Sequence, residues 1–260
     1  MGRPKAALEW HGSTLLRRVV GVLRRSVDGP VVVVRAPGQE LPSLPAGVEL
    51  VDDHVEGHGP LVGILAGLRA VGERAEVAYV SSTDAPGLAP AFVRRVLAGV
   101  DDGVDVALPD ALGHRQPLAA AYRTSLAPVV ERLVAEGRLR PAFLFDAVRV
   151  RVLRDDDLAA ADPGLGSLRN LNEPADYDAA RAEPAPAVRV DRYGTLRPAG
   201  SPPAGVEVRA ATLGAACAAV GVALDGHVVA ALNGDHMVRD PDVPLVAGDV
   251  VSLMTADAGG

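Results

Sequence analysis

The chain has 260 residues, of which 48% are apolar and only 3% aromatic, and its formal net charge is −7. This length allows one large domain or two ordinary ones, with cores filled mainly by valine, leucine and alanine. An acidic chain has no general attraction for nucleic acid, and no apolar run is long enough to cross a bilayer. The single cysteine, Cys217, excludes a disulfide framework within one chain. We therefore expect a cytoplasmic protein with no nucleic-acid or membrane partner.

Short valine-rich runs alternate with helical patterns through the first 182 residues. This alternation predicts an α/β fold with a doubly wound, mostly parallel sheet of the Rossmann-like kind. The predicted helices cover 13–23, 60–71, 90–98 and 126–135, and Asn172 is predicted to cap a last short helix with Glu173 in its first turn. The predicted strands cover 30–34, 48–51, 76–80, 104–108, 118–122 and 148–153.

Residues 182–187 read Ala-Glu-Pro-Ala-Pro-Ala, which is the composition of a stiff linker. After it the pattern predicts two strands, a short helix and two more strands, the element order of a ubiquitin-like β-grasp domain. We therefore predict an α/β domain over 1–182, a linker over 183–187 and a β-grasp domain over 188–260.

Polar and glycine residues follow two of the predicted strands. Asp84 comes just after the strand at 76–80, at the edge of a doubly wound sheet where ligands bind. A carboxylate there can hold Mg²⁺, which takes one or two carboxylates plus substrate phosphates. Asp53 ends a neighbouring strand, and Gly59 lets the chain approach a ligand and opens a helix N-terminus at Pro60 toward an anion. Each of these features alone is also typical of an ordinary cap or turn.

One basic residue differs from the others. The chain has 26 lysine and arginine residues together, and only Lys5 is a lysine. A lysine retained in an arginine-rich composition is a candidate for a role that the planar guanidinium group performs badly.

The order of these motifs resembles the molybdenum cofactor guanylyltransferase family. Residues 1–12 are similar to the end of the nucleotidyltransferase signature, whose lysine lies on the nucleotide phosphates. Residues 57–68 contain a Gly-Pro-Leu-x-Gly segment, and residues 81–86 (Ser-Ser-Thr-Asp-Ala-Pro) look like the family's metal-binding Asp-x-Pro turn. Residues 115–118 and 169–176 resemble its late motifs.

This resemblance implies an enzyme that transfers a guanylyl group from GTP to molybdenum-molybdopterin and releases pyrophosphate, with Mg²⁺ as its metal. The nucleophile is a phosphate that is already ionised, so no general base is assigned. The implied site residues are Lys5 and Asp84 for catalysis, Lys5, Asp53, Gly59, Pro60 and Asp84 for the nucleotide, Asp84 for the metal, and Asn170 and Asn172 for the pterin.

The family also has a strand and a glycine-rich turn before the Met-Gly that opens this sequence. That strand is central in the sheet, so without it the neighbouring backbone groups lose hydrogen-bond partners. We therefore expect the true start codon to lie further upstream. If the chain begins at Met1, we expect no guanylyl transfer and a degenerate first module.

The C-terminal segments at 188–197, 230–234 and 247–251 resemble the small subunit of molybdopterin synthase and its thiamine-pathway relative. In that family an E1-like adenylating enzyme converts the terminal glycine to a thiocarboxylate. By this likeness Gly259 and Gly260 form a sulfur-carrier terminus, and the large subunit of molybdopterin synthase receives the sulfur. The extended, unobstructed backbone of Gly-Gly suits entry into another enzyme's site.

Three functions stay open at this point. The chain is a transferase fused to a sulfur carrier, a nucleotidyltransferase for another nucleotide or substrate, or a non-enzymatic carrier with a degenerate transferase module. A nucleotide-specificity assay separates the first two, and the absence of GTP binding identifies the third.

Overall fold

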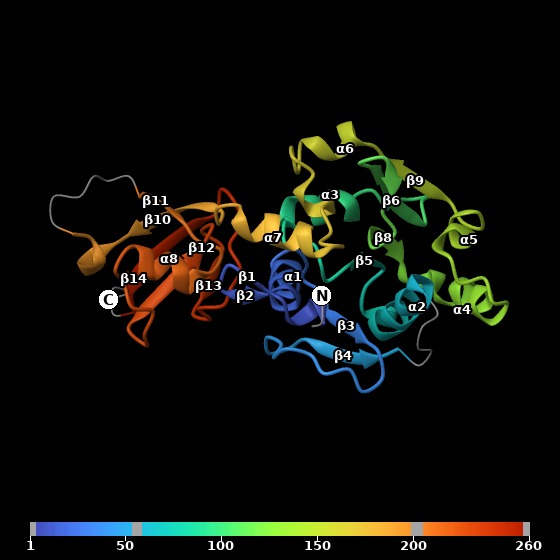
Figure 1. Ribbon diagram of the computed structural model, residues 1–260, viewed down its shortest axis with the longest axis horizontal. Coiled ribbons are helices and arrows are strands. Elements are labelled where there is room, and N and C mark those ends of the chain that lie inside the picture. The colour runs from blue at the N-terminus through green and yellow to red at the C-terminus, as the bar shows by residue number, and fades with distance from the viewer. Residues whose placement is uncertain (1–3, 54–58, 199–204, 257–260) are drawn as a thin grey trace. The chain divides into compact units, whose positions relative to one another are not determined.

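The computed structural model describes residues 4–53, 59–198 and 205–256. The chain divides into two compact units, which are described separately (Figure 1). The larger unit consists of Lys5–Ala7 and Val19–Asn170, and the smaller unit of Met1–Pro4, Leu8–Arg18 and Leu171–Gly260. Within the described residues no helix is long and apolar enough to cross a membrane.

The larger unit alternates strands with helices, as the sequence pattern predicts. The helix predicted at 60–71 is confirmed with the same bounds, and the other predicted helices and strands of this region are found within about three residues of their expected limits. The short helices α5 and α6 were not predicted. The elements are η1 (Lys5–Ala7), the end of α1 (Leu15–Arg24), β3 (Val32–Arg35), β4 (Glu49–Asp52), α2 (Pro60–Val71), β5 (Val77–Ser81), α3 (Pro90–Leu97), β6 (Val106–Ala111), β7 (His114–Arg115), β8 (Ala119–Arg123), α4 (Ala127–Ala135), α5 (Pro141–Phe145), β9 (Val150–Leu153), α6 (Asp155–Ala159) and η4 (Gly166–Leu168).

The prediction of a mostly parallel sheet is wrong for the principal sheet of this unit. Both β5 and β6 pair antiparallel with β8, and only β9 pairs parallel with β6. The reason lies in the connection between β6 and β8. The chain turns tightly through Leu112 and Gly113, with φ of 55° and 86°, instead of crossing over through a helix. A tight turn returns the chain in the opposite direction, whereas a parallel neighbour requires a long crossover.

The sheet of the larger unit is also interrupted. β3 and β4 pair parallel with each other as a separate two-stranded sheet, and β8 is the only described neighbour of β5. Helix α2 lies against β3, β4 and β5, so the two sheets share one helix. All five residues of β5 are partly exposed.

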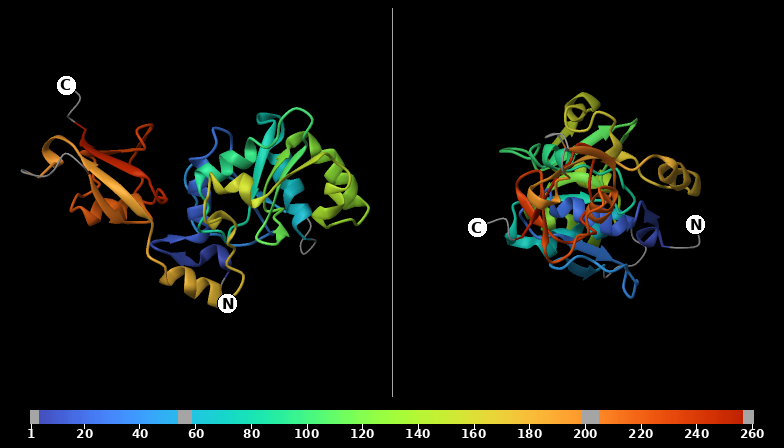
Figure 2. Two further views of the ribbon diagram at one scale, coloured as in Figure 1. Left: turned by 90° about the horizontal axis from the view of Figure 1, so that it is seen from above. Right: turned by 90° about the vertical axis from the view of Figure 1, so that its left-hand side faces the viewer.

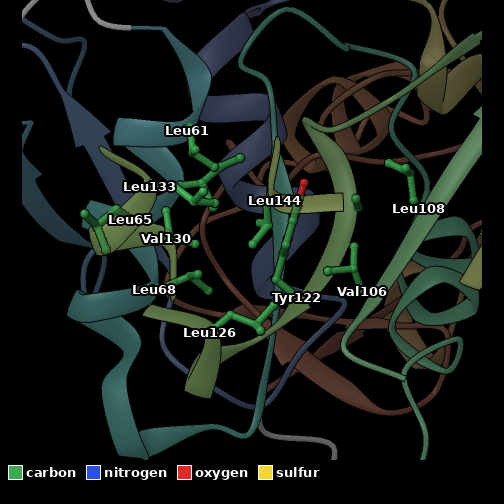
Figure 3. Close-up of a cluster of buried hydrophobic side chains, with 12 residues drawn as sticks. Leu61, Leu65, Leu68, Val106, Leu108, Tyr122, Leu126, Val130, Leu133 and Leu144 are labelled. Carbon is green, nitrogen blue, oxygen red and sulfur yellow. The ribbon is translucent and has the colours of Figure 1, made fainter. Parts of the chain in front are cut away.

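One core cluster of this unit lies between helices α2 and α4 and the principal sheet. Leu61, Leu65 and Leu68 recur at helical spacing on one face of α2, and Figure 3 shows them beside Val130 of α4. Tyr122 of β8 also belongs to this cluster, and its hydroxyl donates to the carbonyl of Pro117 at 2.7 Å. Burial raises the pKa of this tyrosine, so the phenol stays neutral.

The smaller unit contains a five-stranded sheet with the order β11-β10-β14-β12-β13. The last strand is central, because β14 pairs parallel with β10 on one side and antiparallel with β12 on the other. Strand β13 was not predicted. In Figure 2 these strands are orange to red. The elements are β1 (Glu9–Trp10), β2 (Ser13–Thr14), the start of α1, α7 (Pro174–Ala182), β10 (Ala187–Arg192), β11 (Val206–Arg209), α8 (Leu213–Ala219), β12 (Val228–Leu232), β13 (His236–Val238) and β14 (Val250–Thr255).

Alternation along the strands builds the core of this sheet. Val188 and Val190 of β10 and Val251 and Leu253 of β14 are buried in one cluster with α8. Cys217 of α8 lies in the same cluster, and burial raises the pKa of its thiol. This cysteine is therefore a small core residue.

The N-terminal hairpin β1–β2 belongs to the smaller unit. The indole nitrogen of Trp10 donates to the carbonyl of Ala180 at 3.1 Å, and the Arg18 guanidinium lies 4.2 Å from the centre of the Trp10 ring. Arg18 is 2% exposed and donates to the carbonyls of Ala211 and Leu245. Residues from both ends of the sequence therefore form one unit. The predicted domain boundaries, with one domain ending at 182 and the next beginning at 188, concern which segments fold independently, and they stay a prediction.

Candidate functional site

Strand β5 delivers the candidate site at its carboxyl end. The N–H of Ser82 donates to the carbonyl of Leu118 at 2.9 Å, which continues the pairing with β8 for one residue beyond β5. The chain then turns, and the N–H of Leu88 donates to the carbonyl of Ala85 before α3 begins. Asp84 lies in this turn, at the edge of the sheet where the sequence predicts a ligand.

Lys5 and Asp84 are brought together from positions 79 residues apart. The Lys5 ammonium lies 2.8 Å from Oδ2 of Asp84, and the two side chains are 37% and 14% exposed. Exposure of the lysine lets water screen this ion pair, so it contributes little to stability. The pair does place the single lysine of the chain beside the carboxylate predicted to hold a metal. An accessible pair of opposite charges can exchange partners when a charged ligand arrives.

A second contact joins this turn to the end of the larger unit. The Ser82 hydroxyl donates to Oδ1 of Asn170 at 3.1 Å, across 88 residues of sequence. Asn170 is one of the two residues predicted to face the pterin. The structure therefore brings Asn170 to the same turn as Asp84.

The segment before Asn170 supports the turn at two further points. The N–H of Ala89 donates to the hydroxyl of Ser167, which is 1% exposed. A Cβ atom placed on Gly87 would lie 2.5 Å from the carbonyl oxygen of Gly166. Since real Cβ atoms do not approach that closely, glycine is required at position 87. The two segments are thus in direct backbone contact.

Sequence reasoning missed these supporting residues. Ser82 lies within the recognised motif, but its partner is far away in the sequence. Ser167 lies in a Gly-x-Gly-Ser stretch that the sequence analysis did not single out. Two glycines closely before a serine are a recognisable sign of a tight loop, so this signal was available.

The other predicted nucleotide contacts lie at β4 and α2. The N–H of Asp53 donates to the carbonyl of Arg35 at 2.7 Å and extends the pairing of β3 with β4. Gly59 precedes α2 with φ of 83°, a backbone conformation that favours glycine, and Pro60 is the first residue of the helix. Among the residues that the structure describes, no side chain caps this helix start, and a helix N-terminus of this kind can bind an anion.

Asn172 falls in the smaller unit, whereas Asn170 falls in the larger one. The sequence predicts that Asn172 caps the last helix of the first region. The structure instead has Glu173 at the N-cap of α7, and Asp176 accepts from the N–H groups of Asn172 and Glu173. That capping prediction is wrong by one residue, because the Asp176 carboxylate supplies the acceptor. Gly259 and Gly260 lie outside the described residues, as do positions 1–3 and 54–58.

Tyr79 of β5 lies near the site and is distinguished by its buried hydroxyl. This oxygen has no hydrogen-bond partner within the residues that the structure describes. Burial, and in second place the negative charge of Asp162, raises the pKa of Tyr79 far above the ordinary phenol value. Tyr79 is therefore neutral and contributes no charge to the site.

Comparison with known proteins identifies the family. Residues 1–153 match the family described as the MobA-like NTP transferase domain. A molybdenum cofactor guanylyltransferase from Desulfosudis oleivorans is 32% identical over 181 residues, which cover 70% of this chain and 87% of that protein. The chain belongs to the MobA-like NTP transferase family. A probable molybdenum cofactor guanylyltransferase from Mycobacterium avium is 38% identical over 184 residues, covering 69% of this chain and 87% of that protein.

Solved structures agree with this MobA-like assignment at the level of the fold. Molybdopterin-guanine dinucleotide biosynthesis protein A from Archaeoglobus fulgidus has a TM-score of 0.57 at 24% identity, over 69% of this chain and 90% of that chain. The 2-C-methyl-D-erythritol 4-phosphate cytidylyltransferase from Thermus thermophilus has a TM-score of 0.51 at 21% identity, over 69% and 92%. The protein is thus a nucleotidyltransferase of the molybdenum cofactor guanylyltransferase type, with a role in molybdenum cofactor biosynthesis. The family match ends before β10, so it does not include the five-stranded sheet of the smaller unit.

Proposed function

We propose that this nucleotidyltransferase uses GTP and transfers its guanylyl group to the terminal phosphate of molybdenum-molybdopterin. The observation that carries the proposal is the 2.8 Å contact between Lys5 and Asp84, which lies in the family's metal-binding motif. The named relatives that are 32% and 38% identical support the choice of guanylyl donor.

In the proposed reaction, an oxygen of the pterin phosphate forms a bond to the α-phosphorus of GTP. The bond from that phosphorus to the bridging oxygen breaks, and pyrophosphate leaves with the electron pair. The attacking phosphate is already ionised, so no side chain has to remove a proton. Positioning and charge neutralisation therefore account for the catalysis.

Lys5 and Asp84 exchange partners in this proposal. Without nucleotide, each neutralises the other at 2.8 Å. A bound triphosphate offers the Lys5 ammonium a partner with more negative charge, and the Asp84 carboxylate is then released. Lys5 thereafter balances charge on the phosphates.

The released Asp84 carboxylate would hold Mg²⁺, which neutralises phosphate charge when bound. No cluster of three or more His, Cys, Asp or Glu side chains suited to a metal occurs within the described ranges. One carboxylate fits Mg²⁺ that arrives with the nucleotide, because Mg²⁺ takes the remaining ligands from phosphates and water. Asp53 and the α2 start at Gly59 and Pro60 are assigned to the nucleotide, and Asn170 and Asn172 to the pterin.

The test is an assay of purified protein with molybdenum-molybdopterin, Mg²⁺ and each of GTP, CTP and ATP. We expect a guanine dinucleotide product and pyrophosphate, at a rate at least tenfold above that with CTP or ATP. A cytidine product would establish the alternative nucleotidyltransferase. If GTP does not bind at all in the presence of Mg²⁺, the first module is degenerate and the chain is not a transferase.

We further infer that the smaller unit carries sulfur through Gly259 and Gly260. The supporting observation is the strand order β11-β10-β14-β12-β13. Strands β10 and β14 pair parallel at inner positions of this sheet, and helix α8 packs against it. This arrangement supports the predicted ubiquitin-like β-grasp domain. The last strand leads directly toward the Gly-Gly end of the sequence.

The proposed partners of the tail are an E1-like adenylating enzyme and the large subunit of molybdopterin synthase. The full chain is incubated with that adenylating enzyme, ATP and a sulfur donor, and its intact mass is measured. We expect a species heavier by the difference between sulfur and oxygen, and none from a chain lacking Gly260. An unchanged wild-type mass would contradict the molybdopterin-type carrier, and reaction with a thiamine-pathway adenylating enzyme alone would reassign it.

A further inference from the structure

The two polar atoms of the Asn170 side chain differ in their hydrogen bonding. Its Oδ1 accepts from the Ser82 hydroxyl at 3.1 Å. An asparagine amide has one acceptor oxygen and two N–H donors on Nδ2. Throughout the described part of the chain, no hydrogen bond from Nδ2 of Asn170 is found, and the residue is half-buried. The amide therefore presents donors rather than an acceptor to any ligand that reaches it.

Ser82 is well placed to fix that orientation because its own backbone is held. Its N–H donates to the carbonyl of Leu118, and its carbonyl accepts from the Ser81 hydroxyl at 3.0 Å. With both backbone groups engaged, the hydroxyl position depends mainly on one side-chain rotation. A hydroxyl on so constrained a backbone can define which end of the amide faces the site.

The hydrogen bond between Ser82 and Asn170 also fixes the distance between the Asp84 turn and the segment that ends at Asn170. Ser82 precedes Asp84 by two residues, in the turn that Ala89 and Gly87 join to the segment ending at Asn170. The segments 82–89 and 166–170 are therefore connected at both ends. A substrate atom bound to Asn170 is held in a fixed relation to the Lys5–Asp84 pair without movement of either segment.

We propose that Ser82 is a positioning residue that holds Oδ1 of Asn170 and so leaves Nδ2 to donate to an acceptor oxygen of the second substrate. That oxygen belongs to a phosphate or a ring carbonyl, because Nδ2 offers only donors. This inference rests on the proposed function for the identity of the second substrate. It extends that function by stating how the acceptor is selected and which residue sets the selection.

The experiment compares Ser82→Ala with two matched variants. Ser82→Thr keeps the hydroxyl, and Ser26→Ala removes a buried hydroxyl elsewhere in the larger unit that donates to the carbonyl of Val22. For Ser82→Ala we expect the KM for molybdenum-molybdopterin to rise about tenfold, since an oriented hydrogen bond to a substrate is lost. The KM for GTP and the kcat should stay within about twofold of wild type, and both control variants should behave like wild type.

A double-mutant cycle with Asn170→Ala separates positioning from general destabilisation. If Ser82 acts through Asn170, Ser82→Ala adds less than about twofold to the KM in the Asn170→Ala background. The proposal would be overturned if the two substitutions raised the KM independently, so that their factors multiplied in the double variant. An unchanged KM in the Ser82→Ala single variant would also overturn it.

Direct binding separates failure of this inference from failure of the proposed function. Molybdopterin binding is followed by pterin fluorescence, with no GTP or metal present. Absence of guanylyl transfer by wild type, together with weaker pterin binding by Ser82→Ala, would overturn the function and retain the role of Ser82. Transfer by wild type with equal pterin binding by both proteins would overturn the role of Ser82 and retain the function.

Discussion

The two units of this protein differ in how the strands of their sheets are joined. In the smaller unit, β14 lies between β10 and β12 and pairs with both. In the larger unit, β3 and β5 belong to separate sheets, and the shared helix α2 is what connects them. The polar site lies at the end of β5, the strand whose second edge has no described partner. The continuous sheet of the smaller unit therefore serves mainly to build a hydrophobic core. In the larger unit, the candidate site residues lie where the sheet is interrupted, at the end of β5.

The largest effect is expected from a substitution of Asp84, which tests whether the site at the interrupted sheet catalyses guanylyl transfer. We expect Asp84→Asn to lower guanylyl transfer about a thousandfold, because loss of the metal carboxylate removes several kcal/mol of charge stabilisation. The measurement is the initial rate with GTP and Mg²⁺. Asp102→Asn is the control, since Asp102 is exposed in a turn of the same unit. A similar loss in both variants would show that the effect is not specific to the site.

Backbone amide exchange tests the difference between the sheets directly. Two backbone hydrogen bonds fix the pattern of pairing: the N–H of Ser82 donates to the carbonyl of Leu118, and the N–H of Thr124 donates to the carbonyl of Glu76. In this antiparallel register, the even-numbered residues of β5 therefore form the backbone hydrogen bonds with β8. The N–H groups of Val77, Tyr79 and Ser81 therefore point to the opposite edge.

We expect these three amides to exchange about a hundredfold faster than those of Ala78 and Val80, whereas consecutive residues of β14 are all protected. Uniform protection along β5 would mean that its second edge is covered in solution.

Much of this contrast could be predicted from the sequence, and some could not. Runs of valine and leucine locate nearly every long element, and the motif at 81–86 locates the Asp84 turn. Strand direction was mispredicted because β8 has the same apolar composition whether it runs parallel or antiparallel. The bonds of Ser82 and Ser167 could not be predicted, since hydrogen bonds across some 80 residues leave no local pattern.

Substitution of Gly87 should have a smaller effect than loss of Asp84. A Cβ atom at this position would force the carbonyl of Gly166 away, and the turn would shift relative to Asn170. We expect Gly87→Ala to reduce transfer by roughly ten- to a hundredfold, because small displacements of reacting groups are costly. Gly164→Ala is the matched control, since a Cβ at Gly164 meets nothing within 4 Å. Equal activity in both variants would contradict the required contact.

The smallest effect concerns how β9 is joined to β6. The Arg149 side chain donates to both oxygens of Asp105 at 2.9 and 3.0 Å, and these hydrogen bonds lower the pKa of that carboxyl. Stability from a lowered pKa is present above the unfolded value of about 3.9 and is lost as pH falls through the folded value.

We therefore expect Asp105→Asn to lower the urea midpoint slightly at pH 7, and by progressively less as the pH falls below about 3.9. A difference from wild type that grows on acidification would contradict this assignment.

The burial of Arg18 has a consequence for how the protein is made. Its hydrogen bond to Leu245 spans 227 residues, so the partner leaves the ribosome long after Arg18 does. At about 5–20 residues per second, this interval is roughly 10 to 45 s. The hairpin β1–β2 must therefore wait while the intervening residues are translated. The contacts of Arg18 form only after Leu245 has been made, so the interval between the two is the period when a chaperone has most to protect.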